Sequence, residues 1–192
     1  METNNQSFPS VDQLEKELDK LQYKKRFGRV MRSTVFYLVV VAALSVLVAV
    51  LMLPMLQILG SSMSDTLNDG EIVVALHRNL KQGDIIAFYY NNTILIKRVI
   101  ATEGQWVNLD EDGTVYVDGE PLKEDYITEK AFGETNIELP YQVPDARYFV
   151  MGDHRAISID SRNTAVGCVS DEMIIGRIFF RVWPLSGFGR VQ

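Results

Sequence analysis

The sequence contains one cysteine, Cys168, and only two histidines, His77 and His154, among its 192 residues. A single cysteine excludes an intramolecular disulfide and a metal site built from several thiolates, and two histidines disfavour a zinc enzyme. We therefore expect no metal and no other cofactor. We expect Cys168 to be a small core residue rather than a reactive thiol.

Charge is absent from residues 33–64, which include an apolar run from Thr34 to Leu53 that ends at Pro54. Twenty helical residues rise about 30 Å, which matches the hydrocarbon thickness of a bilayer. Five basic residues precede the run, and this asymmetry predicts a cytoplasmic N-terminus and an external C-terminal part. Because the run exceeds a usual signal-peptide core and no small-x-small site follows it, we expect an uncleaved anchor.

Three regions follow from this reading: a cytoplasmic segment at 1–33, a transmembrane anchor at 34–54 and an extracytoplasmic domain at 55–192. In the first region Val11, Leu14, Leu18 and Leu21 share one face of a short amphipathic helix. Residues 1–34 hold seven basic and five acidic side chains, a net of +2. Residues 35–192 hold twelve basic and twenty acidic side chains, and this net charge of −8 argues against a nucleic-acid partner.

The far region is mainly β by its alternating apolar pattern. We expect strands at 71–76, 84–90, 93–100, 106–109, 114–117, 147–151 and 173–183, and an irregular segment at 123–144. Asn91-Asn92 and Asp118-Gly119 are typical of tight turns between paired strands. Many short strands with such turns predict an antiparallel sandwich or barrel.

Two stretches of this region carry candidate chemistry. Residues 60–67 place four hydroxyl groups directly after the apolar run, and Lys97 interrupts a β-branched apolar strand. A hydroxyl needs a base to act as a nucleophile at neutral pH, and a desolvated lysine is one such base. The alternative is a plain serine-rich turn and a lysine on a solvated strand face.

A third polar stretch, residues 152–162, follows the strand at 147–151. It contains two carboxylates and two guanidiniums at matching spacing: Asp153, Arg155, Asp160 and Arg162. Such a set predicts a rigid network of bidentate ion pairs, and the alternative is a solvated loop with local pairs.

With these three stretches in order, the sequence resembles the type I signal peptidases, membrane-anchored Ser/Lys proteases, in their Gram-positive branch. The motif Ser-Met-x-Pro-Thr-Leu is similar to residues 62–67, Lys-Arg-Val to residues 97–99, and Gly-Asp-Asn-Arg-x-x-Ser-x-Asp-Ser-Arg to residues 152–162. The resemblance covers about four fifths of the chain. It implies an antiparallel β domain with an apolar face on the membrane lipid, which acts on signal peptides of exported pre-proteins, with the export machinery as a further partner.

Position by position, the resemblance implies Ser62 as the nucleophile and Lys97 as the general base. It implies that Met63 helps line the substrate cleft and that Ser158 hydrogen-bonds and orients the lysine. Asp160 and Arg162 match a structural ion pair of the family, and Asp153 and Arg155 match supporting positions.

The chain departs from the family pattern at several positions. Asp65 stands where the motif has Pro, and we expect its carboxylate to point away from Lys97, since a nearby carboxylate would raise the pKa of the base. His154 stands where the motif has Asn. Residues 101–105 replace the family's Gly-x-Pro-Gly-Asp turn.

The expected mechanism is acyl transfer through a serine ester. A free lysine has a pKa near ~10.4, and burial that lowers it by about 2–3 units would make the neutral amine available. The Ser62 backbone N–H is one expected oxyanion donor, and the second is unassigned because Gly60 has no hydroxyl.

Three rival interpretations stay open at this point. One is a catalytically weak relative that assists assembly of surface or secreted proteins, which the Asp65 substitution favours. Another is a self-cleaving Ser/Lys repressor, disfavoured by the anchor and the acidic domain. The third is a Ser–His–Asp triad through His154, which we expect instead to be a surface side chain.

Overall fold

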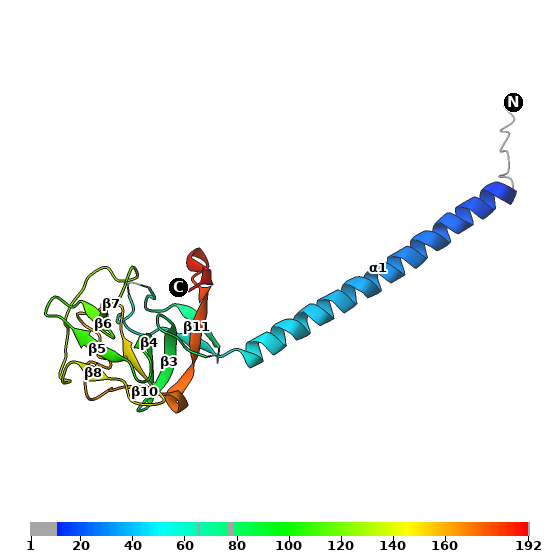
Figure 1. The fold of residues 1–192 in the computed structure, drawn as a ribbon. Coiled ribbons are helices and arrows are strands. Elements are labelled where there is room, and N and C mark those ends of the chain that lie inside the picture. Colours follow the sequence, from blue (N-terminus) through cyan, green and yellow to red (C-terminus); the bar gives the residue numbers. More distant parts are fainter. Residues whose placement is uncertain (1–10, 65, 77–78, 192) are drawn as a thin grey trace, which may run out of the picture. The chain divides into compact units, whose positions relative to one another are not determined.

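The computed structural model describes residues 11–64, 66–76 and 79–191, and it divides into two compact units at residues 52 and 53. The first unit is one helix, α1 (Val11–Met52), which Figure 1 draws as an unbroken coil from blue to cyan. The short amphipathic helix and the apolar run predicted from the sequence are therefore parts of a single 42-residue helix. Its stretch of mean hydropathy 2.0 is long and apolar enough to cross a membrane.

The second unit is built from two antiparallel sheets, as the alternating sequence predicts. The larger sheet has the order β1-β2-β11-β3-β4-β9-β10, with β12 also paired to β11. Its strands are β1 (Met55–Gln57), β2 (Ile72–Leu76), β3 (Ile85–Tyr90), β4 (Thr93–Ala101), β9 (Arg147–Met151), β10 (Val169–Ser170), β11 (Ile174–Trp183) and β12 (Gly189–Arg190). Two single-turn 3-10 helices, η1 (Asp171–Met173) and η2 (Leu185–Gly187), flank β11.

The smaller sheet has the order β7-β6-β5-β8. Its strands are β5 (Trp106–Leu109), β6 (Val115–Val117), β7 (Glu120–Pro121) and β8 (Tyr141–Gln142). The turns predicted at Asn91 and at Asp118-Gly119 are present, with positive φ at all three residues. The sequence missed β1, β7, β8, β10 and β12, because strands of two or three residues leave too few positions for an alternating pattern.

Apolar side chains fill both faces of the larger sheet. Ile86 and Phe88 of β3 point into one buried cluster, whereas Ile85 and Ala87 point into another. This two-sided burial explains why β3 is apolar at consecutive positions rather than at alternate ones.

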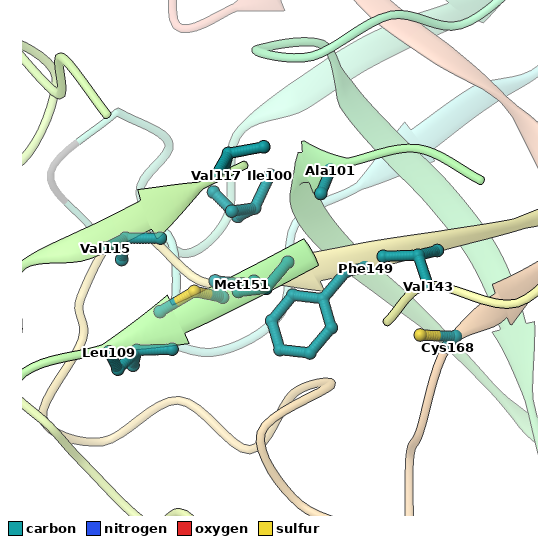
Figure 2. Close-up of a cluster of buried hydrophobic side chains, with 10 residues drawn as sticks. Ile100, Ala101, Leu109, Val115, Val117, Val143, Phe149, Met151 and Cys168 are labelled. Carbon is teal, nitrogen blue, oxygen red and sulfur yellow. The ribbon is translucent and has the colours of Figure 1, made fainter. Parts of the chain in front are cut away.

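A third cluster lies between the two sheets, as Figure 2 shows. Phe149 and Met151 of β9 lie there among side chains of the smaller sheet, including Leu109 and Val115. Cys168 belongs to this cluster and is buried, as predicted, and burial raises the pKa of its thiol to about 11.

Candidate active site

The serine-rich stretch after β1 is a compact turn held by its apolar residues. Met63 and Leu67 are buried in the apolar cluster that includes side chains of β2, β11 and β3. The backbone N–H groups of Thr66 and Leu67 donate to the Met63 carbonyl at 2.8 and 2.6 Å. Ser62 is only partly buried. The buried side chains of Met63 and Leu67 therefore anchor the turn to the core, while Ser62 stays accessible.

The centre of the β4 strand supplies the partner of Ser62. The Lys97 Nζ lies 2.6 Å from the Ser62 Oγ, and Lys97 is only 2% exposed. The sequence alone left open a lysine on a solvated strand face, and this burial excludes that alternative. The structure thus joins two groups that are 35 residues apart in the chain.

Burial sets the protonation of this lysine. The pKa of Lys97 falls from its ordinary 10.5 to about 8, chiefly because burial removes the amine from water. The carboxylates of Asp160 and Asp153 oppose this fall, and the Arg162 guanidinium contributes to it. The direction and size agree with the fall of about 2–3 units expected from an apolar strand. At pH 7 about one molecule in ten then carries a neutral amine, against roughly one in 3,000 for an unperturbed lysine.

The loop after β9 packs against the nucleophile through a glycine. A methyl group on Gly152 would overlap the Ser158 Oγ and lie 2.6 Å from the Ser62 carbonyl oxygen. The Gly152 N–H donates to Asp160 at 3.0 Å, and the His154 N–H donates to the Ser62 carbonyl at 3.1 Å. Only a glycine allows the loop to approach the nucleophile this closely.

The ion pairs of this loop differ in part from the prediction. Asp160 and Arg162 form the expected buried pair, with 2.9 Å between Oδ1 and Nε. Asp153, however, pairs with Arg98 of β4 at 2.6 Å, and Arg155 pairs with Glu124. The spacing of the two carboxylates and two guanidiniums in residues 152–162 predicts that ion pairs form. It does not show whether their partners lie within this loop or elsewhere in the chain.

Four residues that the sequence did not single out complete this network: Thr66, Arg98, Glu124 and Tyr126. Thr66 donates to Asp153 at 2.5 Å and accepts from Arg98 at 3.1 Å, which links the nucleophile turn to β4. The Tyr126 ring covers the Arg98 guanidinium at 3.8 Å, and its hydroxyl donates to Glu124 at 2.8 Å. Arg98 had a visible signal, since it is a second charge in the apolar strand at 93–100, whereas an irregular segment gave none for Glu124 and Tyr126.

A cleft of about 650 Å³ leads to Ser62. Residues 55–60 with Ser62 and Met63 line one wall, and residues 92–96 line the other. Met63 therefore lies at this cleft, and its contact with substrate stays a prediction. The strand β4 pairs with β9 only from Arg98 onward, and β1 is an end strand of the sheet, so both walls present strand edges.

Comparisons with known proteins identify the family. The sequence profile of the family described as "Signal peptidase, peptidase S26" matches residues 30–183, about four fifths of the chain. The chain belongs to this family. It is a signal peptidase of the serine endopeptidase class, and this family is anchored in membranes, in keeping with the one apolar N-terminal helix of the described residues.

Curated relatives come from Gram-positive bacteria. Signal peptidase IB of Staphylococcus aureus (strain COL) is 34% identical over 155 residues, covering 67% of this chain and 77% of the relative. Signal peptidase I T of Bacillus subtilis (strain 168) is 34% identical over 141 residues, covering 66% and 72%. A crystal structure of a signal peptidase I from Enterococcus faecalis V583 is 29% identical, covers 53% of this chain and 98% of that one, and has a TM-score of 0.45.

Two expectations for this signal peptidase are not met in the structure. The Ser158 hydroxyl is buried but has no hydrogen-bond partner among the described residues, so it does not bond to Lys97 here. His154 is not a surface side chain: it is partly buried, and its Nδ1 lies 2.9 Å from the Ser64 Oγ. This contact occupies Nδ1, while Ser62 contacts Lys97, which argues against a Ser–His–Asp triad.

Two further predictions concern the surroundings of the nucleophile. Asp65 lies outside the described residues, so its predicted orientation stays a prediction. The Gly60 N–H donates to Asp69 at 2.7 Å and is therefore engaged, and the second oxyanion donor stays unassigned. Within the described ranges, no group of three or more His, Cys, Asp or Glu side chains is arranged to hold a metal ion.

Proposed function

We propose that the protein removes signal peptides from exported pre-proteins with Ser62 as nucleophile and Lys97 as general base. The observation that carries this proposal is the 2.6 Å contact between Lys97 Nζ and Ser62 Oγ, made by a lysine that is nearly excluded from water. A neutral amine at hydrogen-bond distance can accept the hydroxyl proton, which a charged ammonium cannot do.

The reaction proceeds in two halves. Lys97 takes the Ser62 proton as Oγ attacks the carbonyl carbon before the scissile bond, and the Ser62 backbone N–H stabilises the oxyanion. Lys97 then donates this proton to the amine of the mature protein, which leaves, while the signal peptide stays bound as an ester. Water, deprotonated by Lys97, hydrolyses the ester, and the proton returns to Ser62.

Ion pairs and packing hold the two reacting residues in place. Asp160–Arg162 and Asp153–Arg98 are buried pairs, and Arg155 completes the supporting set through Glu124. Ser158 lies against Gly152 and contributes by packing in the substrate-free protein.

The substrate enters as an extended strand. The cleft lies between edges of β1 and β4, whose unpaired backbone groups can hydrogen-bond to an added peptide. Met63 and its neighbours form apolar walls for the residues that precede the scissile bond. The family resemblance implies small side chains before the scissile bond of this extended peptide.

The proposed location follows from charge and length. We place residues 34–54 of α1 in the membrane, residues 1–33 in the cytoplasm and residues 55–192 outside, because the basic residues lie before the apolar stretch. Membrane lipid then surrounds the apolar stretch, and the export machinery delivers the pre-protein to the same side of the membrane as Ser62.

The test uses the full chain in lipid vesicles with a pre-protein substrate. We expect cleavage by the parent and none by Ser62→Ala or Lys97→Ala, while the controls Ser61→Ala and Lys123→Ala cleave within about twofold of the parent. Ser61 and Lys123 are exposed, and Lys123 pairs with the exposed Asp125, so these controls remove the same chemical groups outside the contact between Ser62 and Lys97. Cleavage by the Ser62→Ala variant at the parental site would exclude Ser62 as the nucleophile.

A further inference from the structure

The contact between Ser64 and His154 joins the two segments that carry the reaction. Ser64 Oγ and His154 Nδ1 are 2.9 Å apart, although the residues are 90 positions apart in the sequence. Both side chains are partly buried, so water competes less with this hydrogen bond than it would on an open surface.

A second hydrogen bond from the same residue ends at the nucleophile itself. The backbone N–H of His154 donates to the carbonyl oxygen of Ser62 at 3.1 Å. The two bonds and the backbone from Ser62 to Ser64 form a closed ring through His154. A ring of this kind restricts both the peptide of Ser62 and the direction from which its side chain leaves the backbone.

Other contacts of the turn hold it at different points. Met63 and Leu67 fix its apolar side, and Thr66 binds Asp153. Within the described residues, the hydrogen bonds that Ser62 makes beyond the turn are those to Lys97 and His154. The orientation of Ser62 relative to Lys97 therefore depends on the hydrogen bonds through His154 as well as on the packing of Met63 and Leu67.

Resting on the proposed role of Ser62, we propose that Ser64 and His154 form a hydrogen-bonded clamp that positions Ser62 for attack. His154 is a positioning residue in this account and takes no proton from the substrate or from Ser62. Neutral Nδ1 accepts from the Ser64 hydroxyl and protonated Nδ1 donates to it, so the clamp holds in both forms of the imidazole.

The expected effect of losing the clamp is moderate. Loss of one neutral hydrogen bond should lower kcat about three- to tenfold. The reason is that a displaced Ser62 spends less time aligned with Lys97 and the substrate. We expect this loss in kcat, with KM changed by less than about twofold, since the clamp lies beside the cleft rather than across it.

Substituting His154 by Asn and by Gln distinguishes loss of the hydrogen bond to Ser64 from a general effect of losing the imidazole. The side-chain oxygen of Asn occupies the position of Nδ1, whereas the amide of Gln occupies the position of Nε2 and cannot reach Ser64 in the same rotamer. We expect His154→Asn to retain at least half of the parental kcat. We expect His154→Gln, His154→Ala and Ser64→Ala each to lose about three- to tenfold.

The experiment measures kcat and KM for the full chain in lipid vesicles, together with the midpoint of thermal unfolding. The double variant Ser64→Ala with His154→Gln should be as active as the slower single variant, because both changes break one bond. An unfolding midpoint within about 2 °C of the parent shows that the lost rate reflects position rather than folding.

Three results would overturn the clamp. The first is a double variant whose loss is the product of the single losses, and the second is a His154→Gln variant as active as His154→Asn. The third is a fall in activity that follows the unfolding midpoint. The Ser62→Ala control separates this failure from failure of the proposed nucleophile, since it stays inactive if only the clamp is wrong.

Discussion

The lowered pKa of Lys97 predicts a steep loss of activity between pH 8 and pH 6. With a pKa of about 8, the neutral amine falls from half of the molecules at pH 8 to about one in ten at pH 7 and about one in a hundred at pH 6. If only the neutral form removes the Ser62 proton, kcat falls about fivefold over the first unit and about ninefold over the second.

The assay is the rate of cleavage of a saturating peptide substrate from pH 5.5 to pH 9 at constant ionic strength. Lys97→Arg is the matched control, because a guanidinium cannot lose its proton in this range, and we expect no activity from it at any pH. A kcat that stays level from pH 8 to pH 6 in the parent would refute the reasoning, as would measurable activity of Lys97→Arg.

The same structure predicts three further effects, all measured on the full chain. Glu124→Gln leaves the buried Arg155 guanidinium without its carboxylate and should lower the free energy of unfolding by about 3–5 kcal/mol, whereas the exposed Asp125→Asn should change it by less than about 0.5 kcal/mol in denaturant titration. Gly152→Ala places a methyl group against the nucleophile's carbonyl oxygen and should lower kcat at least about a hundredfold in the cleavage assay. Lys97→Met should raise the free energy of unfolding at pH 7 by up to about 3 kcal/mol, because the lowered pKa makes the folded state disfavour the charged lysine. That advantage should be full below pH 8 and disappear as the pH rises toward 10.5, and equal stability of Lys97→Met and the parent at pH 7 would contradict the burial argument.

The charged residues of the apolar strand were the most informative part of the sequence. Lys97 in a β-branched run predicts a buried amine, and the structure places it there beside Ser62. The pair Asp160–Arg162 is also predictable, since residues two apart in a tight loop can meet without help from other segments. The long strands were recovered for a similar reason, because runs of β-branched and aromatic residues are a local signal.

The unpredicted parts depend on contacts between distant segments. Arg155 pairs with Glu124, 31 residues away, and Asp153 pairs with Arg98, 55 residues away. No spacing rule can choose among several carboxylates for one guanidinium before the fold brings them together. The contact between His154 and Ser64 was missed for the same reason, because a loop histidine gives no local sign that it is partly buried.

The central claim is that Ser62 carries the acyl group during signal-peptide removal. The most direct measurement mixes the enzyme with a peptide substrate for less than one turnover, quenches in acid and maps the modified residue by mass spectrometry. We predict an adduct with the mass of the signal-peptide fragment on Ser62, present in the parent and absent from Ser62→Ala. An adduct on another residue, or parental cleavage by Ser62→Ala, would contradict the account.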